Sequence, residues 1–176
     1  NCDWSSDVCS SDLPSMWEML IRRHEAGWAT VLTPHAGELR RLTASSSVPI
    51  EDCGAFLVEK GPKTRVLGPG GRGFVDSSGT ASLSCAGSGD VLAGMIAGLL
   101  ACNQRGGGPI DHQAEAGPDA EEVVALRIAA AVWLHGRAGQ EAATGGRPVL
   151  ATDVVRSIPN AIAAARVESG CRTRAM

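Results

Sequence analysis

The sequence contains no apolar run that approaches the roughly 18 residues needed to cross a membrane. It also lacks an excess of basic residues, because 16 Lys and Arg are set against 19 Asp and Glu, for a formal net charge of −3. This balance argues against nucleic acid or an anionic membrane as the principal partner. A chain of 176 residues can bury the core of one domain. The composition fits a fragment of a soluble cytoplasmic enzyme.

The six cysteines include no Cys-x-x-Cys pair, so neither a zinc site nor a disulfide framework is indicated. We expect reduced thiols that fill core or surface positions. Cys85 comes shortly before a glycine-rich loop, where a thiol could touch a nucleotide, but packing is the simpler expectation.

Lysine is nearly absent, since the chain has 14 arginines and two lysines. An arginine bias of this kind is expected from a GC-rich coding sequence. The two lysines, Lys60 and Lys63, fall within one short segment, residues 60–64. Their clustering suggests a binding role for this segment, although two residues can also cluster by chance.

Several common catalytic motifs are missing. No Gly-x-x-x-x-Gly-Lys-Ser/Thr sequence occurs, which excludes a Walker phosphate-binding loop, and neither Gly-x-Ser-x-Gly nor His-Glu-x-x-His is found. Residues 68–73 match Gly-x-Gly-x-x-Gly, but they lead into a predicted strand, whereas a dinucleotide fingerprint leads into a helix. We interpret them as a turn.

Hydrophobic periodicity and turn residues predict alternating helices and strands. We expect helices at residues 17–26, 38–42, 90–101, 121–138 and 152–165, and strands at 29–32, 55–60, 65–68 and 73–76. Thr152 should cap the last helix, and Pro159 should bend or restart it. Residues 103–119 should form a long surface loop. The alternation indicates an α/β fold, and the hairpin at 68–72 indicates a mixed sheet edge.

His135 falls on the apolar face of the helix predicted at residues 121–138. A histidine in that position is more often a hydrogen-bonded core residue than a ligand. We therefore expect it to be buried and assign it no part in a site.

The most informative segment is residues 84–101, where a loop of small residues runs directly into a predicted helix. Its glycines let the backbone approach a ligand, and the first N–H groups of the helix would bind an anion. Asp90 would repel a bound phosphate, so binding alone does not explain it. It fits a base that deprotonates a hydroxyl while the N–H groups hold the phosphoryl group under attack. Alternatively, Asp90 merely caps a buried helix.

Three segments carry a family resemblance when taken together: Thr-Pro-His-Ala-Gly-Glu-Leu at 33–39, Val-Glu-Lys-Gly-Pro-Lys-Thr at 58–64 and Gly-Ser-Gly-Asp-Val-Leu-Ala-Gly at 87–94. In this order they resemble the ADP/ATP-dependent NAD(P)H-hydrate dehydratases of the ribokinase-like superfamily. The resemblance implies a three-layer α/β fold with a central, mostly parallel sheet. The chain departs from the family's loop at Cys85 and Ala86, where Thr and Gly are usual.

The resemblance assigns roles to matching positions. Asp90 would be the catalytic base and contact the substrate, His35 would contact the hydrated nicotinamide, and Glu38 would have a weaker role near magnesium. The amides of three loop residues would form the anion hole: Gly87, Ser88 and Gly89. Gly89 and five further residues would bind the nucleotide: Lys60, Gly61, Pro62, Lys63 and Thr64.

The first two segments also have plain structural interpretations. Residues 33–38 could be only a strand-to-helix turn in which the charge of Glu38 favours the first helical turn, and residues 60–64 only a strand end. The functional interpretation instead places them at the carboxyl end of a strand, where α/β sheets bind ligands.

The reaction implied is the repair of NADH or NADPH that has been hydrated across a ring double bond. ADP or ATP, with Mg²⁺, would phosphorylate the hydroxyl group, and phosphate would then leave as the double bond re-forms. The partners would be the (6S)-hydrate and an adenine nucleotide, with no nucleic acid and no membrane. The resemblance also implies a homo-oligomer and a fused or separate epimerase.

The resemblance extends from Leu20 to Ala165 but covers only the C-terminal half of the family's domain. Residues 1–14 have no helical or strand period and no signal-peptide pattern, and they resemble a translated sequencing-adaptor scar; a disordered native tail is the alternative. We expect residues 15–176 to be the C-terminal half of a dehydratase domain, and to fold poorly without the strands that would cover the sheet.

Two other functions stay open. The glycine loop also serves small-molecule kinases of the same superfamily, such as vitamin-precursor kinases, although these tend to carry Asn where His35 stands. Alternatively, the fragment is no enzyme and only a partial nucleotide-binding module.

Overall fold

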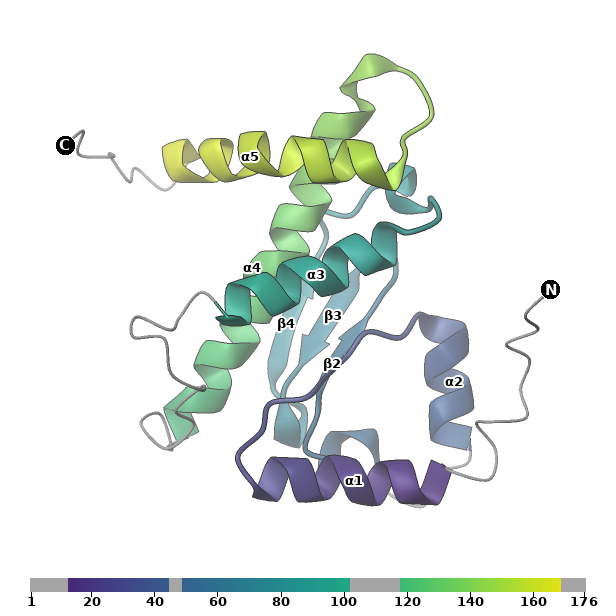
Figure 1. Ribbon diagram of the computed structural model, residues 1–176, viewed down its shortest axis with the longest axis vertical. Coiled ribbons are helices and arrows are strands. Elements are labelled where there is room, and N and C mark those ends of the chain that lie inside the picture. The colour runs from purple at the N-terminus through teal and green to yellow at the C-terminus, as the bar shows by residue number, and fades with distance from the viewer. Residues whose placement is uncertain (1–12, 45–48, 102–117, 169–176) are drawn as a thin grey trace. The chain divides into compact units, whose positions relative to one another are not determined.

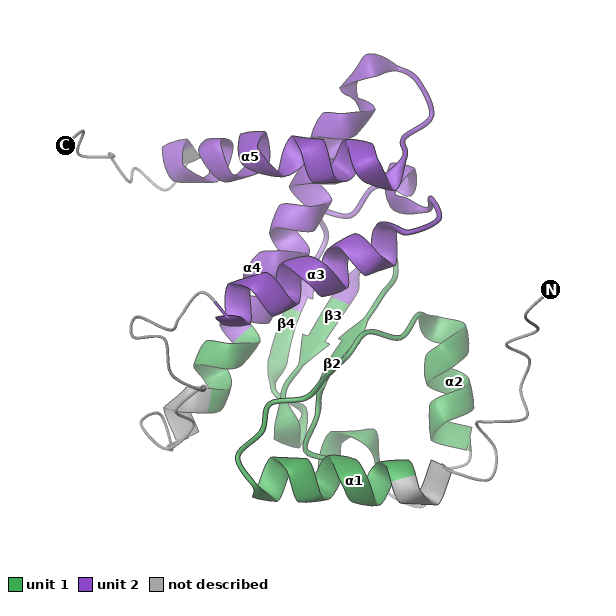
Figure 2. Cartoon of the chain, viewed as in Figure 1, with its two compact units in different colours: residues 1–61, 65–74, 108–125 green, residues 62–64, 75–107, 126–176 purple. Residues whose placement is uncertain are grey.

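The computed structural model describes residues 13–44, 49–101 and 118–168 (Figure 1). They form two compact units (Figure 2), the first from residues 1–61, 65–74 and 108–125 and the second from residues 62–64, 75–107 and 126–176. Two sequence predictions fall mainly outside the described residues: the leader, apart from Leu13 and Pro14, and the loop at 103–119, apart from its last two positions. No helix in the described ranges is long and apolar enough to span a membrane.

A mixed sheet of four strands has the order β1-β2-β3-β4. The strands are β1 (Val31–Leu32), β2 (Phe56–Glu59), β3 (Thr64–Leu67) and β4 (Gly73–Asp76). β1 and β2 run parallel, with Val31 opposite Phe56, whereas β2 and β3 run antiparallel, with Val58 opposite Val66. The four predicted strands are confirmed, and the sheet is mixed, as the predicted hairpin implied.

The turn between β3 and β4 contains the glycine-rich segment at 68–73. The Gly68 amide donates a 2.7 Å hydrogen bond to the Arg72 carbonyl, which closes the turn. Gly70 and Gly71 have φ values of 75° and 78°, a left-handed conformation that favours glycine. The segment leads into β4 and not into a helix, so its interpretation as a turn is confirmed.

The first unit also contains helices α1 (Leu13–Glu25) and α2 (Ala36–Ala44). A core cluster packs α1 against the segment before β2; its buried members are Trp17, Leu20, Cys53 and Ala55. Three consecutive residues of β2 are buried, as expected of a strand covered on both faces: Phe56, Leu57 and Val58. Burial raises the pKa of the Cys53 thiol, which fits the expected core cysteine.

Three helices carry most of the second unit: α3 (Ser88–Ala101), the larger part of α4 (Pro118–Ala142) and α5 (Ala151–Glu168). Its core cluster joins α4, α5 and the segment before α5 through Ala138, Val149, Val154 and Ala161. Partly buried Leu83 and Val91 pack against this cluster, so the segment before α3 and α3 itself rest on it. All helices predicted from periodicity are present.

The start and the middle of α5 differ from expectation. Thr152 is already inside the helix, and Asp153 does the capping, because its carboxylate accepts a 3.0 Å bond from the Leu150 amide. Of the bend or restart expected at Pro159, the restart does not occur, because α5 continues through this residue. The carbonyl that loses its partner to Pro159 belongs to Val155, a residue that is 49% exposed.

Candidate functional site

The carboxyl ends of β1 and β2 bring two of the three motifs together. Because these strands are parallel, the segments that follow them leave the sheet at one edge. His35 and Lys60 pair in an isolated parallel bridge, and the Lys60 amide donates a 2.9 Å hydrogen bond to the Pro34 carbonyl. The segments beginning at Thr33 and Lys60 therefore start side by side, at the edge where α/β sheets bind ligands.

His35 and Glu38 cap helix α2 reciprocally. The Nδ1 atom of His35 accepts hydrogen bonds from the amides of Gly37 (3.0 Å) and Glu38 (3.1 Å). In return, Oε2 of Glu38 accepts a 2.8 Å bond from the His35 amide. This is the pattern of a capping box, with histidine in the place usually taken by Ser or Thr. The strand-to-helix turn that the sequence allowed is thus realised in the structure.

These contacts assign the tautomer of the His35 ring. Because Nδ1 accepts, the proton of the neutral ring lies on Nε2, which stands 3.3 Å from Oε1 of Glu38. Both side chains remain open, with exposed fractions of 54% for His35 and 44% for Glu38. A capping role and contact with a ligand are therefore compatible at both residues.

The turn between β2 and β3 contains the predicted nucleotide-binding segment. Lys60 is partly buried and Thr64 opens β3, while the residues between them are exposed: Gly61, Pro62 and Lys63. Arg65 forms a 3.1 Å ion pair with Glu59, which lies opposite it in the strand register. This cross-strand pair joins the two ends of the turn. The turn thus carries two lysines, Lys60 and Lys63, of which Lys63 is exposed.

The glycine loop before α3 leaves amides available. Gly87 has φ 81°, and its carbonyl accepts the amides of Asp90 and Val91, both at 3.1 Å. The Ser88 amide donates to the Cys85 carbonyl at 3.2 Å. Within the described part of the chain, the amides of Gly87 and Gly89 have no acceptor. Two donors at the positive end of a helix thus lack an acceptor, as an anion site requires. The Ser88 amide, the third predicted member of the anion hole, is already bonded to Cys85.

Asp90 lies in the first turn of α3, and its side chain is exposed. This side chain makes no hydrogen bond or ion pair with the residues that the structure describes. Gly87, not Asp90, stands immediately before the helix, so the carboxylate is not the N-cap. A capping side chain would bond an amide of the first turn, and this one does not. The geometry leaves the Asp90 carboxylate available for a ligand.

The predicted site residues fall in both units. His35, Glu38 and Lys60 belong to the first, and the loop with Asp90 belongs to the second. Within the first unit His35 and Lys60 are brought together, and within the second the loop amides and Asp90 share one helix start.

Sequence reasoning missed the partner of Ser88. Its hydroxyl lies 3.2 Å from Nε2 of His135, and both residues are buried, with exposed fractions of 4% and 7%. Burial lowers the pKa of His135, and a hydrogen bond that the ring donates to the Ser88 backbone partly offsets this shift. His135 is the buried histidine that the apolar helix face predicted. A local pattern does not reveal a partner 47 positions away.

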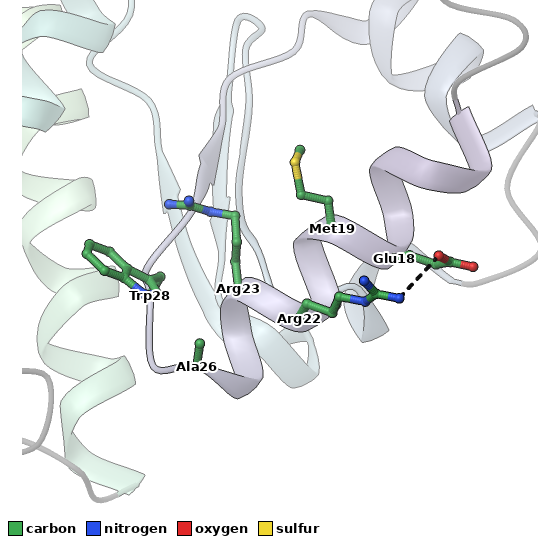
Figure 3. A pocket seen from close by; sticks show the side chains of 6 residues that line it. All are labelled: Glu18, Met19, Arg22, Arg23, Ala26 and Trp28. Carbon is green, nitrogen blue, oxygen red and sulfur yellow. Dashed lines mark ion pairs between the residues drawn. The ribbon is translucent and has the colours of Figure 1, made fainter.

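A pocket lies on α1 and the loop after it, away from these motifs in the sequence (Figure 3). Arg22 pairs there with Glu18 at 3.8 Å, and Arg23 lies over the Trp28 ring at 5.7 Å from its centroid. None of its lining residues is a predicted site residue, so the pocket has no part in the chemistry considered below.

The mixed sheet, its helices and the glycine loop at the start of α3 define an α/β protein of the ribokinase-like class. The chain belongs to the NAD(P)H-hydrate dehydratase family, whose model matches residues 19–160. The two alternatives left open by the sequence, another kinase and a non-catalytic module, are not better supported.

Known relatives agree with this family. A bifunctional NAD(P)H-hydrate repair enzyme from Moorella thermoacetica is 34% identical over 143 residues, which are 73% of this chain and 24% of the relative. An ADP-dependent (S)-NAD(P)H-hydrate dehydratase from Neisseria meningitidis is 36% identical over 61% of this chain and 34% of its own length. The chain thus spans about a quarter to a third of these relatives.

A solved structure gives the same result for the fold. It is an ADP/ATP-dependent NAD(P)H-hydrate dehydratase from Bacillus subtilis, co-crystallised with ATP and Mg²⁺. The TM-score is 0.56 at 26% identity, and the match covers 78% of this chain and 48% of the other.

Proposed function

We propose that the protein containing this chain dehydrates hydrated NADH and NADPH at the expense of ADP or ATP. The observation that carries the proposal is the start of α3. There, two amides without an acceptor stand in the same helical turn as an exposed carboxylate without a partner among the described residues. An anion site combined with a base suits transfer of a phosphoryl group to a hydroxyl.

The reaction proceeds in two steps because hydroxide is a poor leaving group. Asp90 accepts the proton of the substrate hydroxyl as its oxygen attacks the terminal phosphorus of the nucleotide, and the bond from that phosphorus to the bridging oxygen breaks. The amides of Gly87 and Gly89, joined by Ser88, hold the oxygens of the transferring group. Phosphate then departs with the electrons of its C–O bond, the neighbouring ring carbon loses a proton, and the double bond re-forms.

The segments at residues 33–38 and 60–64 supply the binding groups. His35 contacts the hydrated nicotinamide through its half-exposed ring, whose Nε2–H is directed by Glu38. Lys60 and Lys63, with the backbone of Gly61, Pro62 and Thr64, bind the nucleotide phosphates or adenosine. The exposure of this turn and the charge of its lysines support that role.

The magnesium ion that the family implies is also part of the proposal. The described residues contain no group of three His, Cys, Asp or Glu that could hold a metal on their own. Mg²⁺ with a nucleotide needs only one or two carboxylates, because phosphate oxygens and water complete its shell. Glu38 is the carboxylate proposed to help hold it. When bound, the ion neutralises phosphate charge.

The domain organisation, oligomeric state and location of the enzyme are also part of the proposal. We infer that residues 15–176 form the C-terminal half of a dehydratase domain, which the 48% coverage of the solved chain supports. The bifunctional character of one relative supports a second, fused activity. We expect this activity to be that of an epimerase, fused or separate. We expect a homo-oligomer that acts in the cytoplasm.

The test uses the full-length protein, hydrated NADH and either ADP or ATP. We expect recovery of the NADH absorbance together with release of one phosphate for each molecule repaired. Asp90→Asn should bind nucleotide as well as the wild type or better, because a negative charge beside the phosphates is removed. Its turnover should fall by about 10²- to 10⁴-fold, as for the loss of a general base. Unchanged turnover in this variant, or a phosphorylated product that accumulates without eliminating phosphate, would overturn the proposal.

A further inference from the structure

Ser88 and His135 form a buried polar contact behind the glycine loop. The 3.2 Å distance between the serine Oγ and the histidine Nε2 is that of a hydrogen bond, and both residues are almost fully buried. Removing one partner would leave the other buried without its bond, at a cost of about 1–3 kcal/mol. The contact therefore ties the first residue of α3 firmly to α4.

The position of Ser88 gives this contact a consequence for the loop. Its two neighbours, Gly87 and Gly89, are the residues whose amides lack an acceptor among the described residues. Glycine has more backbone freedom than any other residue, so these amides are not oriented by their own side chains. The side chain between them is the one in this stretch that is anchored in the interior.

The other end of the contact belongs to a helix that is itself held in place. Next to His135, Gly136 packs so closely on Ser78 that no Cβ would fit there. The Ser78 carbonyl accepts a 2.8 Å bond from the Gln140 side chain, and its hydroxyl lies 3.4 Å from the Trp133 carbonyl. These contacts fix α4 on either side of His135, so the imidazole is a rigid support.

We propose that His135 is a positioning residue that holds the Ser88 side chain and thereby aims the Gly87 and Gly89 amides at the transferring phosphoryl group. The inference rests on the proposed function of the loop. His135 is 7% exposed and therefore acts through Ser88, without touching the substrate. A displacement of about 1 Å in such donors is enough to cost up to about 100-fold in rate.

The test separates positioning from stability with a double-mutant cycle in the full-length protein. Ser88→Ala and His135→Leu each leave one buried polar group without its partner, so each should lower the melting temperature. The double variant removes both groups and should regain much of that stability. If His135 positions the loop, kcat stays at least 10-fold below wild type in the double variant, with a smaller change in the Kd for ADP. His135→Gln, which keeps a donor near Nε2, should restore part of kcat.

A matched control is available on the same helix. Ile128→Val removes one buried methylene from a fully buried α4 residue and should lower stability without touching the loop. A kcat in the double variant that equals wild type, or that falls no further than in Ile128→Val at equal melting temperature, would overturn the inference. Failure of the proposed function looks different, since Asp90→Asn would then keep its turnover.

Discussion

The two loops that carry the proposed chemistry are built in opposite ways. In the loop at residues 33–38, His35 and Glu38 cap α2, so the side chains proposed to meet ligands also hold the fold. In the loop at residues 85–90, the buried Ser88 makes the anchoring contact, whereas the exposed Asp90 has no partner in the described chain. In the first loop the same residues stabilise the fold and are proposed to contact ligands. In the second loop these two roles belong to neighbouring residues, Ser88 and Asp90.

The largest expected effect tests this division directly. Asp90→Ala should lower turnover by at least about 100-fold, since it removes the proposed base. Its free energy of unfolding should stay within about 0.5 kcal/mol of wild type, as for other exposed side chains without a structural contact. Steady-state kinetics and thermal unfolding of the same preparation give both quantities.

The matched variant in the other loop is His35→Ala. It should lose activity and stability together, because the ring that contacts substrate also accepts two amide bonds at the start of α2. The proposed contrast between the loops would be wrong if Asp90→Ala were as unstable as His35→Ala, or if His35→Ala were as stable as wild type.

The second prediction concerns the helix start that supports the glycine loop. A Cβ on Gly87 would lie 3.3 Å from the Ala151 side chain, so the first turn of α5 stands against this loop. Asp153 holds that turn through two 2.9 Å bonds from Arg147 and one from the Leu150 amide. Asp153→Asn keeps an oxygen for the amide but loses the charge, and should lower the melting temperature at neutral pH.

The size of that effect should depend on pH in a defined direction. The pKa of Asp153 is lowered from 3.8 to about 2 in the folded chain, and the largest cause is its hydrogen bond with Arg147. A carboxylate with a depressed folded pKa stabilises the fold above its unfolded pKa and loses that contribution as the pH falls through the folded value. The difference in melting temperature between wild type and Asp153→Asn should therefore shrink from about pH 4 to about pH 2. A difference that stays constant over this range would contradict the assignment.

How much the sequence predicts also differs between local and distant features. Periodicity gave strand 73–76 with both ends correct and placed the helix at 90–101 within two residues of its start, because both patterns are local. The cap of α5 was misplaced at Thr152 because Asp153, one residue later, reaches back to the Leu150 amide. The Ser88–His135 contact depends on how α3 packs beside α4, which no local pattern encodes.

For the candidate site, too, the sequence predicts local motifs but not the contacts between them. The sequence motifs identified the glycine loop, Asp90 and the histidine segment, and the structure brings His35 beside Lys60 through the parallel pairing of β1 and β2. The histidine cap was not foreseen, since His is an uncommon capping residue. The sequence nevertheless contains an indication of this cap, because Glu38 follows His35 by three positions, which is the spacing of a capping box.

A third, smaller effect is expected at Glu38. Glu38→Ala removes the acceptor for the His35 amide and should cost about 1 kcal/mol, or about 2–4 °C in melting temperature for a chain of this size. Glu38→Gln retains an oxygen at the same place and should cost less. If thermal unfolding showed both variants to be equal to wild type, the cap would not contribute to stability, and Glu38 would be free for the proposed metal role alone.

The smallest effect is expected at the ion pair below the nucleotide turn. The Arg65 side chain is 53% exposed, and an exposed pair of this kind contributes little because water screens the charges. Arg65→Gln should therefore change the free energy of unfolding by about 0.5 kcal/mol or less. Lys60→Ala should be equally mild for stability yet should weaken nucleotide binding, with a smaller loss in kcat. Calorimetric titration with ADP measures the difference between them. If both variants lost the same affinity for ADP, the Glu59–Arg65 pair would be needed to shape the turn. The turn would then resemble the cap of α2, where the same residues stabilise the fold and are proposed to contact ligands.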